Sequence, residues 1–222
     1  HYRDSMWMRD IMYDQDLFLL QVALALRPPE AFFAALLDRF DLVAWFAHGD
    51  TAHAVYDADQ LTFMAEELLL LLAMLLGETS VVAQWPIEAQ VRRELVHYLA
   101  LGAGTYSEVT RHIPERFTDH GCFDRELARV AHFRQPGGTA DVGTYELRRE
   151  YYAEVEPFFH HYSRNQRERA DEVLREKRAA GWDVPRLPRA PLAALAGTPL
   201  AGTPLAALAG VFVSDVFADV LY

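Results

Sequence analysis

Histidine and cysteine residues at short spacings are the first candidates for metal chemistry in this sequence. His112, His120 and Cys122 carry donors of the kind that bind zinc, but their spacing matches no zinc-binding pattern and a fourth ligand is missing. His160 and His161 are adjacent, so on a helix their side chains would point about 100° apart and would not readily share an ion. We therefore expect no metal ion and no cofactor in this segment.

Carboxylates and catalytic motifs give no sign of a calcium site or an active site. The segment Asp14-Gln15-Asp16 resembles the opening of a calcium-binding loop, but it lacks the required glycine and terminal glutamate, so helix capping is the favoured interpretation. Glu66 and Glu67 are neighbours on a predicted helix and are expected to form its exposed edge. The sequence has no nucleophile elbow, no phosphate-binding loop and no glycine-rich dinucleotide motif. We therefore predict no catalytic residues in this segment.

Composition and charge restrict the possible partners. The chain has 222 residues and a formal net charge of −11, which argues against a general nucleic-acid or anionic-membrane surface. Its one cysteine cannot form an internal disulfide. The start, His1 to Asp4, has neither an initiator methionine nor a signal-peptide pattern, so we expect a piece of a longer protein. The longest purely apolar run, Leu68 to Leu76, is too short to span a bilayer.

Apolar residues at helical spacing predict a helical scaffold over residues 1–84. One helix follows Asp14, and Pro28-Pro29 breaks it and starts a second helix. The second helix is expected to run without interruption through Phe32 to Phe46. A third is predicted from Asp59 to Leu76, ending at Gly77.

Residues 86–150 are expected to form a winged-helix domain. Ile87, Val91, Leu95 and Leu99 mark one helical face. The segment Thr105-Tyr106-Ser107-Glu108 is a capping box that opens a short second helix ending near Pro114. A third helix carries Phe123, Leu127 and Val130, and a glycine-rich turn then leads into a strand over residues 143–147. DNA binding is disfavoured, because the third helix offers Arg125 and Arg129 against Asp124 and Glu126.

Residues 151–182 are predicted to contain a long polar helix, from Phe158 to about Ala180. Its cations outnumber its carboxylates, and its apolar residues are too few to bury a full face, so it is either solvated or bound to a partner. Residues 183–210 form a Pro/Ala/Gly-rich linker by composition, and residues 211–222 begin a further apolar helix.

Blocks of sequence in collinear order resemble the UBR-box N-recognin ubiquitin ligases of the N-degron pathway. Residues 12–21, MYDQDLFLLQ, are similar to the family's MYDKD-x-x-x-LQ, and residues 93–99, RELVHYL, to its REIIH-x-L. Residues 132–137 resemble FKKPG, residues 143–147 resemble G-x-YEL, and residues 158–164, FFHHYSR, resemble YFYHYS. Further blocks are 66–78, similar to EEML…VGER, and 204–216, similar to PLF…LQSDVM.

The resemblance implies an internal segment of a RING-type ubiquitin transferase that directs proteins with destabilising N-terminal residues to degradation. The cytoplasm is the expected location, with the nucleus as a second one. The zinc-binding UBR box and RING are expected elsewhere in the parent protein. The partners implied are a ubiquitin-conjugating enzyme and other domains of the same ligase. The helix after the winged-helix domain would bind that enzyme, with Phe159 and Tyr162 as anchors and Arg164, Arg167 and Arg175 supplying charge.

Three alternatives stay open at this point. The aromatic residues at the start of the long helix could pack onto the winged-helix domain instead of a partner. The whole segment could be an architectural spacer between the substrate-recognition and RING modules. A DNA-binding winged-helix regulator would require a basic face on the third helix.

Overall fold

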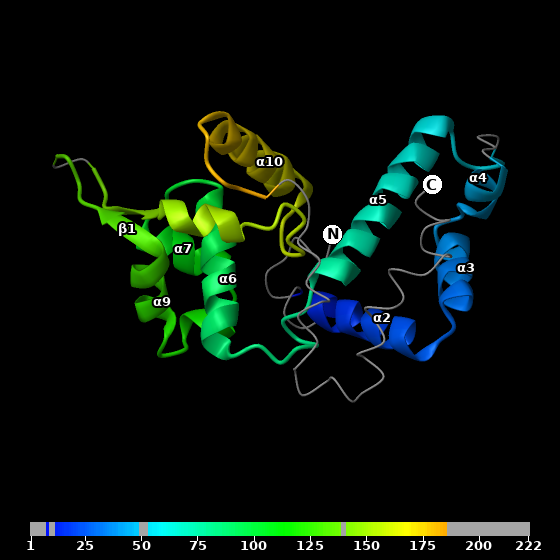
Figure 1. Ribbon diagram of the computed structural model, residues 1–222, viewed down its shortest axis with the longest axis horizontal. Helices are drawn as coiled ribbons and strands as arrows, with labels where there is room; N and C mark the ends of the chain where they lie inside the picture. The colour runs from blue at the N-terminus through cyan, green and yellow to red at the C-terminus, as the bar shows by residue number, and fades with distance from the viewer. Residues whose placement is uncertain (1–7, 9–11, 49–52, 139–140, 186–222) are drawn as a thin grey trace. The chain divides into compact units, whose positions relative to one another are not determined.

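The chain folds into two mainly helical units. The structure, a computed structural model, describes residue 8 and residues 12–48, 53–138 and 141–185. Among these residues, one unit combines the chain up to Gln15 with residues 84–185, and the other contains residues 16–83. The fold class is as predicted, with helices and one small antiparallel sheet (Figure 1). Within the described ranges, no helix is long and apolar enough to cross a membrane.

The unit of residues 16–83 is built from four helices among the described residues. These are α2 (Asp14–Leu26, with its first two residues assigned to the other unit), α3 (Pro29–Arg39), α4 (Val43–His48) and α5 (Ala58–Gly77). Pro29 occupies the first turn of α3, where a missing N–H costs little. Asp57 and Gln60 form a reciprocal capping box at the start of α5. The predicted boundaries of this last helix therefore hold to within about one residue.

The prediction of one uninterrupted helix through Phe32–Phe46 is wrong. The chain leaves the helix at Phe40, and Asp41 has a φ of 57°, in the left-handed region. The amide of Leu42 then donates to the Leu37 carbonyl, and α4 begins at Val43. The apolar spacing continues across the break, which is why periodicity alone did not reveal it.

A buried glutamine joins α2 to the end of α5 within this unit. The Gln21 side chain donates to the carbonyl oxygens of Leu75, at 3.0 Å, and of Glu78. Leu75 lies in the last turn of α5 and Glu78 is its C-cap, where carbonyl groups have no intrahelical partner. The core of this unit includes buried leucines and phenylalanines of α2, α3 and α5 together with Leu42, namely Leu17, Leu24, Phe32, Phe33, Leu36, Leu42, Leu61, Leu68, Leu72 and Leu75.

The other unit has the helix and strand order of a winged helix, as predicted. It contains α6 (Ile87–Ala100), α7 (Tyr106–His112), α8 (Glu115–Thr118) and α9 (Phe123–Val130), followed by the strands β1 (Ala131–Arg134) and β2 (Thr144–Leu147). Thr105 and Glu108 form the predicted capping box of α7. In Figure 1 the hairpin extends away from the helices of this unit.

The hairpin is antiparallel and gains a third, single-residue partner. Ala131 faces Leu147 and Arg134 faces Thr144 across the pair. On the other side of β2, the amide of Gly104 donates to Tyr145, and the Tyr145 amide donates back at 2.8 Å. A Cβ at Gly104 would lie 3.3 Å from the Tyr98 ring, so a side chain here would require the ring to shift by a few tenths of an ångström.

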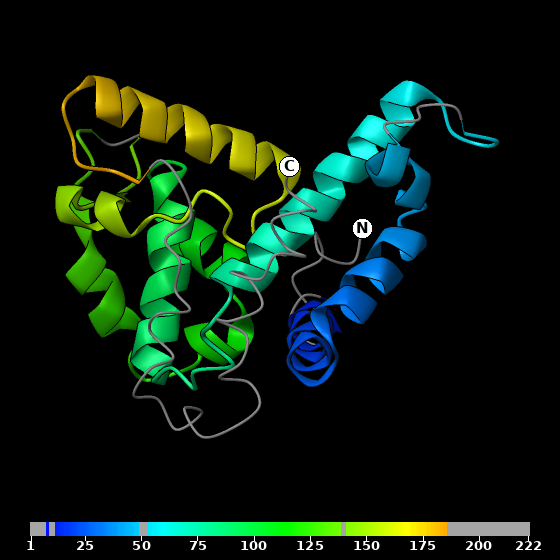
Figure 2. The same cartoon turned by 45° about the vertical axis from the view of Figure 1, so that its right-hand side comes forward.

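One hydrophobic core extends through this unit beyond the predicted limit of residue 150. The chain continues as a 3-10 helix, η3 (Arg149–Glu154), and as α10 (Arg164–Ala179). Val155, Leu174 and Val184 are buried in the same cluster as the residues of the winged helix. That cluster includes Val91, Leu95, Leu99, Val109, Ile113, Phe117, Phe123, Leu127 and Val130. The helix predicted to be a separate partner-binding segment is thus packed against the winged helix, and Figure 2 shows its length. Most of the predicted linker, and the helix predicted for 211–222, lie outside the described residues.

Removing the α7 capping box should lower the free energy of unfolding. Thr105→Ala deletes an acceptor for the Glu108 amide, and such caps contribute about 1 kcal/mol. We expect the free energy of unfolding, measured by urea denaturation, to fall by roughly that amount. Thr110→Ala, inside the same helix, is the matched control and should lose little. Equal losses in both variants would contradict this account of the cap.

Candidate functional site

The helix proposed to bind a partner begins six residues later than predicted. The chain from Phe158 to Tyr162 forms turns, and α10 starts at Arg164 with Ser163 as its N-cap. The Ser163 Oγ accepts from the Gln166 amide, while the Gln166 side chain accepts from the Ser163 amide at 2.9 Å. The S-x-x-Q pattern was present in the sequence and would have placed this start correctly.

Phe159 and Tyr162 are buried inside the unit. Their exposed fractions are 4% and 3%, and they form a small cluster with Ala170 of α10. The Tyr162 hydroxyl donates to the main-chain carbonyl of His97 at 2.6 Å. These contacts correct the expectation that the two aromatic side chains anchor a partner, since their surfaces are already covered. Phe159 and Tyr162 pack onto the winged-helix domain, as the first alternative stated, and hold the start of α10 against α6.

The outward face of α10 carries the predicted arginines. Arg164 and Arg175 are more than half exposed, and each pairs with a carboxylate of the same helix, Glu168 and Asp171 respectively. Arg167 is half-buried on the first turns. Side-chain pairs at this exposure contribute little to stability, so a partner's carboxylates could replace them. The structure brings the three arginines onto one helix, and their role in binding stays a prediction.

The last cations of α10 are used within the chain. Lys177 lies over the rings of Tyr152 and Trp182, with its Nζ 5.1 and 4.6 Å from their centroids. Arg178 donates to the Pro185 carbonyl at 2.8 Å. These contacts hold the chain that leaves the helix.

A neutral histidine lies beneath the turn that precedes α10. The Nδ1 of His97 lies 2.6 Å from the Arg93 carbonyl and must donate, since a carbonyl only accepts. Its Nε2 accepts the Glu156 amide at 2.8 Å, so both ring nitrogens are satisfied without a charge. The ring stacks on Phe159 at 4.0 Å between centroids. Burial, reinforced by the Arg93 guanidinium, lowers the pKa of His97 to about 3.

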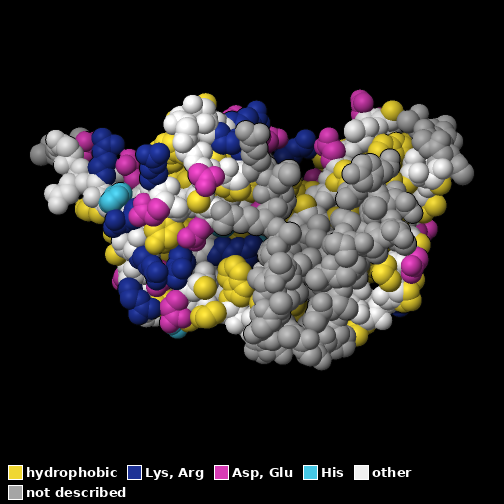
Figure 3. All heavy atoms as spheres, viewed as in Figure 1, with side chains coloured by type: hydrophobic (Ala, Val, Ile, Leu, Met, Phe, Trp, Pro, Cys, Tyr) yellow, Lys and Arg dark blue, Asp and Glu magenta, His cyan; other side chains and the backbone are white. Residues whose placement is uncertain are grey.

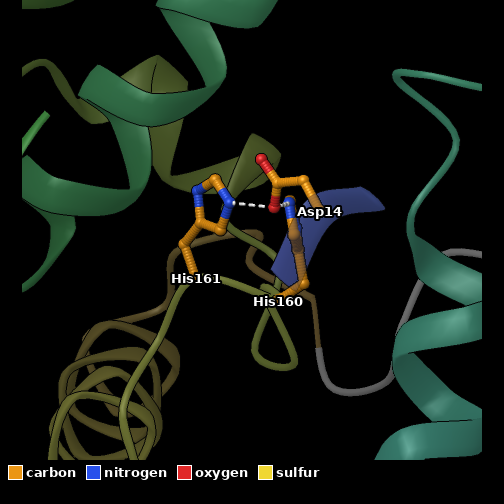
Figure 4. A group of neighbouring side chains, drawn as sticks. All are labelled: Asp14, His160 and His161. Atoms are coloured by element: carbon orange, nitrogen blue, oxygen red, sulfur yellow. Dashed lines mark hydrogen bonds and ion pairs between the residues drawn. The ribbon is translucent and has the colours of Figure 1, made fainter. Parts of the chain in front are cut away.

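A second histidine of the same turn lies between two carboxylates. The Nε2 of His161 is 2.7 Å from Asp14 Oδ1 (Figure 4). Its Nδ1 is 2.8 Å from Glu94 Oε1. Nε2 of His160 approaches the same Asp14 oxygen at 3.7 Å, and Arg116 pairs with the other Asp14 oxygen. Asp14 was predicted to cap a helix, but its carboxylate is engaged by this cluster instead.

Electrostatics in this cluster favour charged groups despite burial. Burial alone would lower the pKa of His161, but the carboxylates of Glu94 and Asp14 outweigh it and raise the pKa to about 9. Burial would likewise raise the pKa of Asp14, yet its contacts with His161, His160 and Arg116 lower it. Sequence reasoning missed this group, because assigning residues 158–162 to a helix separated the two histidine side chains.

The other histidines considered for metal binding do not come together. His112 stacks on the ring of Tyr98, and its Nδ1 lies 2.8 Å from the Glu108 carbonyl oxygen. His120 and Cys122 are in contact, with Nδ1 3.0 Å from Sγ. Among the described residues, the one group of three or more ligand side chains with metal-binding proximity is Asp14, His160 and His161.

The third helix of the winged-helix fold carries balanced charges. Glu126 is buried and pairs with Arg92 at 3.2 Å, and it also lies within 4 Å of Arg125 and Arg129. Arg125 additionally approaches Glu88. Figure 3 shows basic and acidic side chains intermingled on the visible face of this unit. Such a surface gives little support to phosphate binding.

Comparisons with known families agree with this architecture. Residues 90–184 match a family described as E3 ubiquitin-protein ligase UBR1-like, winged-helix domain, and residues 1–71 match the UBR1/2/3-like ARM repeat domain. The chain is also similar to E3 ubiquitin-protein ligase ubr1 of Schizosaccharomyces pombe, with 36% identity over 178 residues, 80% of this chain. This chain is a segment of the UBR family.

Other UBR ligases are similar over comparable lengths. Mouse UBR2 is 28% identical over 197 residues, or 85% of this chain, and human UBR1 is 28% identical over 177 residues, or 78%. The matched regions are 9% of the fission yeast protein, 11% of mouse UBR2 and 10% of human UBR1. The UBR winged-helix match includes α10, in agreement with the shared core.

The neutral state of His97 predicts a loss of stability in mild acid. Its pKa is about 3 when folded and about 6.5 when unfolded, so the unfolded chain binds more protons between these values. The contribution of His97 is therefore full above pH 6.5 and declines as the pH falls, by about 2 kcal/mol between pH 6.5 and 5. The groups facing this ring are Arg93, Glu94, Glu156, Phe159, His160 and Tyr162.

Urea denaturation of the wild type and His97→Gln at several pH values would measure this effect. We expect the variant to be less stable at pH 7 but to lose less on acidification. His132→Gln, an exposed change on the hairpin, should keep the wild-type slope. An unchanged slope in His97→Gln would refute the assignment.

Proposed function

We propose that this segment recruits a ubiquitin-conjugating enzyme for a ubiquitin ligase that recognises destabilising N-terminal residues. The observation that carries the proposal is the two-sided character of α10. Its inward face buries Ala170, Val173 and Leu174, whereas its outward face presents exposed arginines. The helix contains six cations and four carboxylates in RNQRERADEVLREKRA, so it is locally basic in an acidic chain.

The docking of α10 supports the proposal by reducing the entropic cost of binding. A helix that must order itself on a partner loses conformational entropy at that moment, whereas a helix held on a folded domain does not. Ser163, Tyr162 and Lys177 fix its two ends through the contacts described above. The exposed arginines would then act mainly through charge complementarity, which raises association rates and selects among partners.

The rest of the proposal concerns the longer parent protein. The transferase activity would come from a RING domain and the substrate specificity from a UBR box, both with bound zinc and both outside this segment. This segment would contribute no catalytic residue, would bind neither nucleic acid nor membrane, and would contact other domains of the same ligase. The relatives named above are ubiquitin-protein ligases, which supports this assignment. Cytoplasm and nucleus are the proposed locations.

Charge reversal on the first turns of α10 should weaken the complex. We expect Arg164→Glu with Arg167→Glu to raise the dissociation constant roughly tenfold or more, because two attractive contacts become repulsive. Acidic residues are tolerated in the first turn of a helix, so the fold should persist. The measurement is calorimetric titration with a panel of ubiquitin-conjugating enzymes in moderate salt.

A single charge reversal outside α10 distinguishes a local contact from bulk charge. Arg134→Glu changes an exposed arginine on the hairpin, which is 74% exposed, and should leave the affinity near the wild-type value. An equal loss of affinity in both variants would show that net charge, and not a contact of α10, causes the effect. Absence of binding to every enzyme by the folded chain would favour the architectural-spacer alternative. The ion pairs of Arg164 with Glu168 and of Arg175 with Asp171, both within α10, support that alternative.

The DNA-binding alternative makes a separate prediction. Because Glu126 and Glu88 offset the arginines of α9, we expect no saturable binding to short duplex DNA at physiological salt. Fluorescence anisotropy with labelled duplexes would measure it. Tight binding that persists at this salt concentration would revive the alternative.

A further inference from the structure

Two imidazole nitrogens converge on one carboxylate oxygen in the interior of the winged-helix unit. Nε2 of His161 and Nε2 of His160 lie 2.7 and 3.7 Å from Asp14 Oδ1 (Figure 4). The histidine side chains are 3% and 6% exposed and that of Asp14 is 10% exposed. One ligand atom from each of the three residues lies within 4.8 Å of the others.

The contact with Glu94 favours one tautomer of His161, the one in which Nε2 can offer a lone pair to an ion beside Asp14. The Nδ1 atom lies 2.8 Å from Glu94 Oε1, and an ionised carboxylate at that distance favours a hydrogen on Nδ1. In the neutral ring the remaining nitrogen, Nε2, presents its lone pair toward the Asp14 oxygen. Either a proton on Nε2, donated to Asp14, or a metal ion can occupy the space between these two atoms, which lie 2.7 Å apart.

We propose that Asp14, His160 and His161 bind a zinc-class transition-metal ion, with Glu94 holding His161 from the outer shell. Two imidazole nitrogens and one carboxylate oxygen are ligands that suit Zn²⁺, whereas Mg²⁺ and Ca²⁺ prefer oxygen alone. A carboxylate that accepts the second N–H of a ligating histidine is the usual support of such sites. The expectation that His160 and His161 could not share an ion assumed a helix, and the two residues precede α10 instead.

The distances and charges are compatible with an ion at this position. Zinc bonds of about 2.0–2.1 Å place neighbouring ligands of a tetrahedral site roughly 3.3 Å apart. The observed 2.7 and 3.7 Å lie on either side of this value, so each imidazole would move by about half an ångström. Two buried carboxylates balance a divalent ion, and Arg116 contacts the other oxygen of Asp14, leaving Oδ1 accessible. A proton on Nε2 of His161 competes with the metal ion for this position.

Metal analysis of the purified 222-residue chain tests the site independently of any conjugating enzyme. The protein, without an affinity tag, would be incubated with Zn²⁺, dialysed against metal-free buffer and analysed by mass spectrometry of the elements. We expect about one zinc per chain and almost none in His160→Gln. His132→Gln, which removes an exposed histidine of the hairpin, should retain the wild-type zinc content.

Cobalt substitution provides a second readout that does not depend on a variant folding. Bound Co²⁺ in the wild-type chain should give the visible absorption of a tetrahedral or five-coordinate nitrogen and oxygen site, and equimolar Zn²⁺ should abolish it. Zinc should also raise the melting temperature of the wild type by a few degrees but not that of His160→Gln. Absence of zinc from the folded wild-type chain, or equal zinc in His160→Gln, would overturn the proposal and leave a proton as the cation.

Discussion

A positive charge between two buried carboxylates is the constraint on which the winged-helix unit depends. Asp14 and Glu94 face opposite nitrogens of the His161 ring, and these residues come from three distant parts of the chain. A buried carboxylate without a partner costs several kcal/mol, so neither can be removed from water unless the ring or an ion supplies charge. The first residue of α2, the helix α6 and the turn before α10 are therefore held together.

A histidine of α6, packed against the same turn, is in the opposite protonation state. His97 is neutral because a carbonyl takes its one N–H and a main-chain amide occupies its other nitrogen. His161 is favoured in its charged form because both of its nitrogens meet carboxylates. Burial alone would make both rings neutral, so the difference arises from their partners. Phe159 stacks on one ring and lies edge-on to the other, which fixes the turn between them.

Local patterns predicted the parts of this fold that depend on neighbouring residues. The capping box at Thr105, the apolar spacing of α6 and α9, and the strand before Leu147 could all be inferred because their determinants lie within a few positions. The break at Asp41 was missed, since it depends on one residue in a left-handed conformation. The start of α10 was misplaced because Phe158, Phe159 and Tyr162 imitate a helical stripe.

The buried charge cluster could not be predicted by any local pattern. Asp14 and His161 are 147 positions apart, and nothing in the neighbourhood of either residue indicates the other. The family resemblance included all three segments, but a resemblance between sequence blocks does not state which side chains meet. The arginines of α10 could be located from sequence, whereas the burial of Phe159 and Tyr162 required the tertiary packing.

The docking of α10 explains how so polar a helix can form without a partner. Its buried face has only Ala170, Val173 and Leu174, too little apolar surface to stabilise sixteen residues by packing alone. The capping box at Ser163 and the contacts of Lys177 with two aromatic rings supply further stabilisation at the two ends. None of these interactions uses the exposed arginines in the middle and first turns. The helix can therefore exchange its weak surface ion pairs for a partner's carboxylates while its own attachment to the domain remains intact.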